Sequence, residues 1–421
     1  MTPPRVTFFY DVVCPYAYLG STQIRQTCAD AGATLTYKPV LLGGIYNAID
    51  PQPGARKPLP AARVRGNAED LYRWAEHRGV TLQFPPGHPR RTVEAMRLLC
   101  AAELHAPDHL PALTDALYRA YWVTGDDITD RAVLTRIAAE HGLLIDLIDD
   151  PAVKDHLRKN TDEAVAEGVF GVPAFLVESD AGRRLIFGQD RMHFLDQALR
   201  GTLGQQVTYA APSDAAPSPG RELLFYFDFS SPFTYLAATQ IERVAAERGA
   251  RLAWRPILLG GLFKEIGNPI VPIAEMSEAR RRYLLRDMAD WSAHWGVPFR
   301  FPSRFPMMTV TALRMTLAAG PDLVRLAQAI FRAYWAEDRD INDKPTLAEI
   351  ACSLGLDGAA LVEATGDPAI KQRLSDNTAE AVRAGAYGLP TFLVENEGGP
   401  GLFFGQDRLD FVSRALARPR P

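Results

Sequence analysis

The sequence contains one pattern written twice. The stretch FFYDVVCPYAYLG, which begins at Phe8, matches FYFDFSSPFTYLA, which begins at Phe225, so the offset is 225 − 8 = 217 residues. The motif FGQDR also occurs in both halves at this offset, at residues 187–191 and 404–408. Motifs that recur in the same order at a fixed spacing indicate a tandem duplication. We therefore expect two similar domains rather than two unrelated ones.

The repeat is not perfectly regular. At the motif RAYW the offset falls by four residues, because Tyr121 matches Tyr334, and it returns to 217 at Asn160 and Asn377. This slip predicts a short insertion in the first copy.

Between the copies lies a stretch rich in Ala, Pro, Ser and Gly without apolar periodicity. Such a composition is typical of an extended linker. We predict one domain over residues 1–203, a linker over residues 204–220 and a second domain over residues 221–421.

Each copy has the same order of predicted elements, namely a βαβ unit, a helical insertion and a ββα unit. A parallel βαβ unit followed by a hairpin defines an α/β fold. Proline-containing runs, VPAFLV and LPTFLV, and then RLIF and GLFF, supply the last two strands of the copies. The other predicted strands cover residues 6–10, 34–39, 223–227 and 251–256, and the main predicted helices cover residues 16–31, 69–78, 93–104, 110–122 and 233–248.

The composition narrows the class of protein. Of the 421 residues, 47% are hydrophobic and 23% are charged, which is typical of a globular protein. The net charge is −4, whereas proteins that bind nucleic acids through the phosphates usually carry an excess of basic residues. No apolar run reaches the roughly 18 residues that span a bilayer, and no signal peptide is evident. The four cysteines have no metal-ligand spacing. We expect a cytoplasmic protein with no metal, membrane or nucleic-acid partner.

The first candidate site residues stand before the proline that opens the first helix of each copy. Cys14 and Ser231 occupy the same position. The free N–H groups of a helix start favour a thiolate, so Cys14 is a candidate nucleophile and Ser231 a candidate donor to a bound thiolate. The alternative is structural, because Ser is a common N-cap and Cys is often a buried apolar residue.

Two more segments recur in both copies. Pro173 and Pro390 each precede a strand, and a cis peptide bond there would present backbone groups to an extended peptide; a trans proline at a strand edge is the alternative. The FGQDR motif supplies an Asp–Arg pair to each copy. Its Asp can cap a helix or bind an ammonium group, and its Arg can grip a carboxylate.

Taken together, these motifs resemble a known family. The segments SSPF, LLGGLFKEIGN, FRAYWAEDRDI, NTAEAV–AGAYGLPTF and FFGQDRL are similar to those of 2-hydroxychromene-2-carboxylate isomerase and the kappa-class glutathione transferases, which belong to the DsbA-like branch of the thioredoxin fold. The resemblance covers nearly all of residues 221–417. The first copy resembles the same branch less closely, and its Cys-Pro-Tyr-Ala looks like a DsbA-type Cys-Pro-x-Cys with Ala17 at the second cysteine position.

The resemblance implies bound glutathione. It places Ser231 beside the glutathione sulfur, and Leu389, before a cis-proline at Pro390, against the glutathione main chain. It places Asp407 at the γ-glutamyl end. The remaining implied binding residues of the second copy are Arg408, Lys264, Asn268 and Asn377, and those retained in the first copy are Val172, Pro173, Asp190, Arg191 and Asn160.

The copies also depart from the family pattern. Asn47 replaces the lysine in the first copy, and residues 49–53 read IDPQP in place of IGNPI. In the second copy Met308 stands before Thr309, where related isomerases often carry a polar residue. The resemblance therefore does not name the substrate.

Three hypotheses follow. The favoured one is a glutathione-dependent isomerase or transferase acting on a conjugated, aromatic or anionic small molecule by reversible thiolate addition. The second is a DsbA-like monothiol disulfide oxidoreductase that uses Cys14, because Ala17 removes the resolving cysteine. The third is a non-enzymatic binding module. Relatives with one copy per chain form dimers, which implies an internal pseudo-dimer here, with a homodimer as the further possibility.

Overall fold

The structure, a computed structural model, describes residues 3–49, 58–207, 220–395 and 401–417. It divides into two compact units, one of Met1–Lys57, Glu69–Leu203 and Ser277–Arg282 and the other of Pro58–Ala68, Gly204–Met276 and Tyr283–Pro421. Most of the predicted linker, and residues 50–53 of the IDPQP stretch, lie outside the described residues. The domain limits 1–203 and 221–421 therefore stay a proposal.

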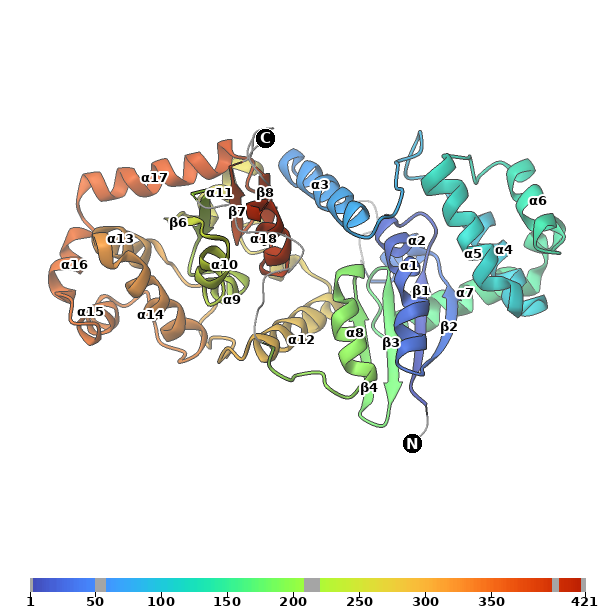
Figure 1. Ribbon diagram of the computed structural model, residues 1–421, viewed down its shortest axis with the longest axis horizontal. Helices are drawn as coiled ribbons and strands as arrows, with labels where there is room; N and C mark the ends of the chain where they lie inside the picture. The colour runs from blue at the N-terminus through green and yellow to red at the C-terminus, as the bar shows by residue number, and fades with distance from the viewer. Residues whose placement is uncertain (1–2, 50–57, 208–219, 396–400, 418–421) are drawn as a thin grey trace. The chain divides into compact units, whose positions relative to one another are not determined.

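The first unit contains a four-stranded mixed sheet (Figure 1). Its order is β2 (Thr34–Pro39), β1 (Arg5–Tyr10), β3 (Ala174–Ser179) and β4 (Gly182–Phe187). β1 runs parallel to β2, and helix α1 (Pro15–Asp30) connects them, whereas β3 and β4 pair antiparallel as a hairpin. The predicted βαβ unit and terminal hairpin are both present.

The second unit repeats this sheet with the order β6-β5-β7-β8. The strands are β5 (Glu222–Phe227), β6 (Arg251–Pro256), β7 (Thr391–Val394) and β8 (Gly401–Phe404). The strand pairings are also the same, with β5 parallel to β6 and antiparallel to β7. The α/β thioredoxin-like fold predicted for each copy is confirmed.

Stacked aromatic rings hold the central strands of each sheet together. Phe8 of β1 stacks on Phe175 of β3 with ring centroids 5.2 Å apart, and Phe225 of β5 stacks on Phe392 of β7 at 5.5 Å. All four rings are fully buried. Aromatic pairs across strands add stability beyond the burial of their area, so these pairs help to fix the register of the central strands.

Helices surround both sheets. In the first unit their fully described members after α1 are α2 (Leu42–Ile49), α3 (Ala61–His77), α4 (Val93–His105), α5 (Leu110–Arg119), α6 (Arg131–Glu140), α7 (Pro151–Ala166) and α8 (Met192–Leu199), although the first part of α3 groups with the second unit. In the second copy they are α9 (Pro232–Ala238), α10 (Ile241–Arg248), α11 (Leu259–Ile266), α12 (Glu278–Trp295), α13 (Val310–Ala318), α14 (Leu323–Trp335), α15 (Lys344–Ser353), α16 (Gly358–Ala364), α17 (Pro368–Arg383) and α18 (Leu409–Ala417).

The helix predicted over residues 233–248 is in fact two helices, α9 and α10. The hydroxyl of Thr239 donates to the Leu236 carbonyl at 2.7 Å, and the Gln240 side chain donates to that hydroxyl at 3.0 Å. The equivalent Thr22 hydroxyl makes the same bond to the Leu19 carbonyl, at 2.8 Å, inside the continuous helix α1, so this bond alone does not account for the break. The prediction of one continuous helix was wrong.

The four-residue slip in the repeat has a structural basis. Helix α4 has 13 residues and its counterpart α13 has 9, so the first copy contains about one extra helical turn there. The second copy recovers the offset where it forms helix α16, because the first copy has only a short 3-10 segment, Ile145–Asp149, at that place. The insertions fall in the helical regions and leave the sheets equal.

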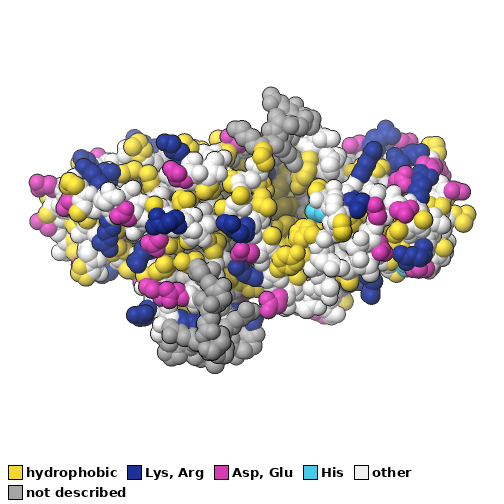
Figure 2. All heavy atoms as spheres, turned by 90° about the horizontal axis from the view of Figure 1, so that it is seen from above, with side chains coloured by type: hydrophobic (Ala, Val, Ile, Leu, Met, Phe, Trp, Pro, Cys, Tyr) yellow, Lys and Arg dark blue, Asp and Glu magenta, His cyan; other side chains and the backbone are white. Residues whose placement is uncertain are grey.

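The surface carries charges of both signs, interspersed on the face that Figure 2 shows. Many exposed arginines pair with carboxylates, as Arg25 does with Asp115. No helix among the described residues is long and apolar enough to cross a membrane.

Candidate functional site

In the second copy, Ser231 begins helix α9 and faces the loop that precedes β7. Its Oγ accepts a hydrogen bond from the Thr234 N–H at 3.2 Å and donates one to the Leu389 carbonyl at 3.0 Å. The backbone of Ser231 is extended and Pro232 follows, as is usual at a helix start. One hydroxyl therefore caps the helix and joins it to a loop 158 residues further along the chain.

The peptide bond between Leu389 and Pro390 is cis. The Pro390 carbonyl accepts a hydrogen bond from the Gly405 N–H at 3.0 Å, so the cis-proline loop is tied to the GQDR segment after β8. Gly405 has a φ of 105°, and a Cβ there would lie 2.4 Å from Asp407 Oδ1. A glycine is needed at this position for both reasons.

Asp407 and Arg408 form an ion pair of 3.0 Å, and the side chain of each is no more than 15% exposed. The equivalent pair in the first copy, Asp190 and Arg191, is separated by 3.2 Å. Each pair begins two residues after the glycine whose N–H donates to the cis-proline carbonyl. The structure thus brings the three recurring sequence motifs of each copy into one chain of contacts.

The first copy reproduces this arrangement with a cysteine. Cys14 Sγ donates to the Val172 carbonyl at 3.1 Å, and the Val172–Pro173 bond is cis. The Gly188 N–H donates to the Pro173 carbonyl at 3.0 Å. Cys14 thus makes the same contact as Ser231, although its side chain does not cap the helix.

Burial raises the pKa of the Cys14 thiol to about 12, which outweighs the backbone N–H groups of the helix start that favour the thiolate. Cys14 is 6% exposed, and Ala17, in the place of a second cysteine, is fully buried. A protonated and shielded thiol is a poor nucleophile, since the thiolate is the reactive form. In this structure Cys14 therefore acts as a hydrogen-bond donor.

A buried carboxylate lies behind each helix start. Asp228 accepts hydrogen bonds from the Ser230 N–H at 3.0 Å, the Leu259 N–H at 2.8 Å and the Thr309 hydroxyl at 2.6 Å. These donors belong to the turn before α9, the start of α11 and the start of α13. Asp228 therefore connects three separate segments around Ser231.

Asp11 does the same in the first copy. It accepts from the Val13 N–H at 3.1 Å, the Leu42 N–H at 2.9 Å and the Thr92 hydroxyl at 2.9 Å. Burial raises the pKa of Asp11 and of Asp228, while these hydrogen bonds oppose the shift. In the sequence, the only indication that these two residues matter is that Asp11 and Asp228 occupy the same position in the two copies.

Tryptophans of the RAYW motif fix the same turns from another side. The Trp122 indole N–H donates to the Val12 carbonyl at 2.8 Å, and the Trp335 indole donates to the Phe229 carbonyl at 2.8 Å. Both tryptophans are fully buried. The recurrence of RAYW is thus explained by support of the turn.

Comparison with known proteins identifies the family of both copies. The family described as the DSBA-like thioredoxin domain matches residues 5–200 and again residues 222–417. The chain belongs to the DsbA-like thioredoxin family. It carries two copies of the domain in tandem.

Named proteins are similar to about half of the chain. A 2-hydroxychromene-2-carboxylate isomerase of Sphingobium xenophagum is 27% identical over 198 residues, which are 46% of this chain and 96% of that protein. Glutathione S-transferase kappa 1 of Rattus norvegicus is 30% identical over 202 residues, covering 46% of this chain and 89% of the relative. A solved structure of a 2-hydroxychromene-2-carboxylate isomerase is 25% identical with a TM-score of 0.42, covering 46% of this chain and 94% of that one.

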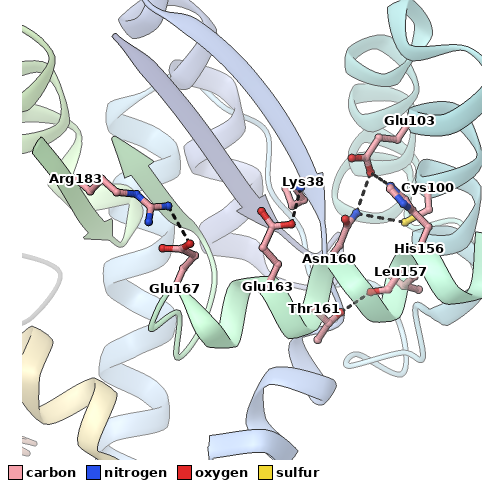
Figure 3. A network of polar contacts seen from close by, with 10 residues as sticks. All are labelled: Lys38, Cys100, Glu103, His156, Leu157, Asn160, Thr161, Glu163, Glu167 and Arg183. Atoms are coloured by element: carbon pink, nitrogen blue, oxygen red, sulfur yellow. Dashed lines mark hydrogen bonds and ion pairs between the residues drawn. The ribbon is translucent and has the colours of Figure 1, made fainter. Parts of the chain in front are cut away.

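Asn160 and Asn377, the two asparagines predicted to bind glutathione, form hydrogen bonds to neighbouring segments of the protein. Figure 3 shows Asn160 on α7 pointing at Glu103 and Cys100 of α4, with Nδ2 to Glu103 Oε2 at 2.9 Å. The His156 Nε2 lies 3.0 Å from the same carboxylate oxygen. Asn377 donates instead to the Pro256 carbonyl at 3.0 Å. Among the described contacts, both asparagines pack α7 and α17 onto neighbouring segments.

Lys264 and Asn268 lie on and just after helix α11. The Leu259 N–H at the start of that helix is bound to Asp228, which places α11 beside the Ser231 turn. Lys264 is exposed, and the Asn268 N–H donates to the Phe263 carbonyl at 2.8 Å. Asn47, in place of the lysine in the first copy, is also exposed.

Among the described residues no group of three or more His, Cys, Asp or Glu could hold a metal ion.

We predict that Thr309→Val destabilises the protein by about 1–3 kcal/mol, because it removes one donor from the buried Asp228 carboxylate. The control is Thr316→Val, since the Thr316 hydroxyl is fully buried and, within the residues that the structure describes, bonds only to the Ala312 carbonyl of its own helix. Urea unfolding followed by circular dichroism measures both. Equal losses in the two variants would contradict the role given to Asp228.

The loss caused by Thr309→Val depends on pH. Burial raises the pKa of folded Asp228 above its unfolded value, so this carboxyl favours the folded state most at low pH and loses that contribution as pH rises through the folded pKa. Removing a donor to the charged form raises the folded pKa further. The destabilisation should therefore be larger at neutral pH than near the ordinary pKa of an aspartate, and the same unfolding experiment at both pH values measures it.

We also predict that Cys14 reacts slowly with iodoacetamide at neutral pH and faster only at strongly alkaline pH, because burial raises its pKa to about 12. Cys352 is exposed and serves as the internal control. Mass spectrometry of peptides after timed alkylation gives both rates. Faster alkylation of Cys14 than of Cys352 at neutral pH would contradict this picture.

Proposed function

We propose that the chain is a glutathione-dependent isomerase or transferase and that its second DsbA-like copy carries the reaction at Ser231. The observation that supports this most is the Ser231 hydroxyl, held at a helix start 3.0 Å from the carbonyl that precedes a cis-proline. The names of the curated relatives, an isomerase and a kappa-class glutathione transferase, agree with it.

Ser231 would activate the glutathione thiol. A thiol is mostly protonated at neutral pH, and hydrogen bonds to the thiolate lower its pKa. The Ser231 hydroxyl is a donor that can turn from the Leu389 carbonyl to a sulfur atom, while the start of α9 adds a partial positive charge. Both effects favour the charged form of a sulfur placed at this turn.

The other residues would hold the tripeptide. The backbone of Leu389 would pair with the glutathione main chain, since a segment before a strand can receive an extended peptide. The Asp407 carboxylate would bind the γ-glutamyl ammonium group, and the Arg408 guanidinium beside it would bind a carboxylate. The cis-proline loop and the GQDR segment are already joined through Pro390 and Gly405, so these groups would act as one unit.

The proposed reaction is a reversible conjugate addition. The thiolate sulfur forms a bond to the β-carbon of a conjugated carbonyl compound, and the π electrons move to the carbonyl oxygen as an enolate. The former double bond is then single and can rotate. When the enolate collapses, the carbon–sulfur bond breaks and glutathione is released unchanged. Lys264 and Asn268 lie at the helix beside the site and would hold an anionic substrate or stabilise the enolate.

The first copy would be a second, different glutathione site. Val172, Pro173, Asp190 and Arg191 repeat the arrangement, with Cys14 as the donor in place of Ser231. The protonated Cys14 thiol and the buried Ala17 give little support to the alternative of a disulfide oxidoreductase. A non-enzymatic binding module is the remaining alternative, and it predicts glutathione binding without turnover.

We expect Ser231→Ala to lower kcat/KM by about 10- to 100-fold, because a hydrogen bond to a charged group is worth about 1.5–3 kcal/mol. It should also move the acidic limb of the pH–rate profile to higher pH. Ser231→Thr keeps both the cap and the hydroxyl and serves as the control. Turnover of 2-hydroxychromene-2-carboxylate and of an aryl halide in the presence of glutathione is the measurement. Intact turnover in Ser231→Ala would exclude the role of Ser231.

We expect Asp407→Asn to weaken glutathione binding by about tenfold, because the amide cannot pair with an ammonium charge. The matched control is Asp190→Asn, which tests the first copy alone. Calorimetric titration with glutathione separates the two sites by stoichiometry. If the two variants leave both sites unchanged, the FGQDR motif does not bind glutathione.

A further inference from the structure

A polar pocket lies at the start of helix α4 in the first copy, and the proposed reaction does not use it. Its volume is about 350 Å³, and neither Cys14 nor Val172 lines it. The size is at the lower end of the roughly 300–1,000 Å³ that small-molecule sites occupy. The lining residues are Arg91, Val93, Glu94, Arg97, Thr129 and Arg131.

One of the three arginines is neutralised within the protein. Arg131 binds both carboxylate oxygens of Glu94, with Nε and Nη2 each at 3.0 Å, and its Nη1 lies 3.0 Å from Asp149. The Thr129 hydroxyl donates to Asp127. Arg131 and Glu94 therefore form an ion pair that lines one side of the pocket. The positive charge of the pocket comes from the other two arginines.

Arg91 and Arg97 carry that charge. Within the described part of the chain, neither has a hydrogen bond or an ion pair to another residue. Arg91 is exposed at the rim, and Arg97 is partly buried. A guanidinium group has five N–H donors and no acceptor, so removing it partly from water is costly unless an acceptor is supplied. Two such groups around one small pocket match a carboxylate or a phosphate.

The backbone N–H groups at the start of α4 add a partial positive charge to that of the two arginines. Thr92 is the N-cap of α4, but its hydroxyl donates to Asp11 and makes no cap bond. The first N–H groups of α4, at residues whose side chains line the pocket, therefore have no side-chain cap. Their partial positive charge has the same sign as that of Arg91 and Arg97.

The second copy lacks this set of residues. Met308, which is 70% exposed, occupies the position of Arg91, and Thr311 occupies that of Glu94. Lys344 replaces Arg131, and of the three arginines the second copy retains only the one at the position of Arg97, as Arg314. The exchange removes one of the two unpaired charges and the bidentate pair that forms the wall.

We propose that this pocket is a binding site for a small anion with a carboxylate or phosphate group, and that the first copy alone possesses it. Arg91 and Arg97 bind the anion, and the Arg131–Glu94 pair shapes the wall. The site is independent of the glutathione chemistry proposed for Ser231, so either assignment can fail without the other.

Calorimetric titration of the full chain with inorganic phosphate, and separately with succinate, tests the site. We expect one anion per chain, with phosphate stronger if the natural ligand is a phosphate ester and succinate stronger if it is a dicarboxylate. Arg91→Met, which copies the second domain at an exposed position, should weaken binding at least tenfold, and Arg97→Gln should do the same. Arg314→Gln, the matched change in the second copy, should leave binding unchanged.

The failure of this site is recognisable. Absence of binding by both anions, or binding that Arg91→Met leaves unaltered in a chain with the parent circular dichroism spectrum, overturns the proposal. Loss of binding in Arg314→Gln but not in Arg91→Met places the anion in the second copy and also overturns it. Glutathione titration of the same variants should be unchanged, which separates this result from that of the proposed function.

Discussion

The hydrogen bonds to one buried carboxylate in each copy, Asp11 or Asp228, are the interactions on which the rest of the candidate site depends. Asp228 accepts hydrogen bonds from the Ser230 turn, from the first residue of α11 and from Thr309 at the start of α13. Without it, three segments that are distant in sequence would present unpaired donors to a buried space, which costs more than the bonds themselves contribute. The carboxylate thus sets where Ser231 stands relative to the helical region.

The two copies use this frame with different interiors. Tyr10, Tyr37 and Tyr118 are buried in the first copy, and Phe227, Trp254 and Phe331 occupy their places in the second. The Tyr10 hydroxyl is paired with Thr114 at 2.7 Å. These three substitutions give the first site a more polar surrounding, whereas its Cys14 is a weaker hydrogen-bond donor than Ser231. The copies have kept the backbone frame and changed the chemistry around it.

The sequence predicts the sheets well and the site only in part. The strands at residues 34–39 and 251–256 have the predicted limits, and each carries an aromatic residue and ends in a proline. The break between α9 and α10 leaves no trace in the apolar periodicity, which continues from Leu236 to Ile241 and Val244. The pairing of Ser231 with Leu389 spans 158 residues and exists only once the sheet has formed. In the sequence Asp228 is a polar residue after a strand, and nothing there shows that three separate segments donate hydrogen bonds to it.

The ionisation of bound glutathione tests the central claim most directly. Ultraviolet difference spectra record thiolate absorbance when glutathione is added to the full chain at neutral pH. If Ser231 lowers the pKa of the glutathione thiol, the parent protein and Cys14→Ser should both show a thiolate signal, and Ser231→Ala should lose it while still binding the tripeptide. A thiolate signal that persists in Ser231→Ala, or no signal in the parent protein despite bound glutathione, would contradict the account.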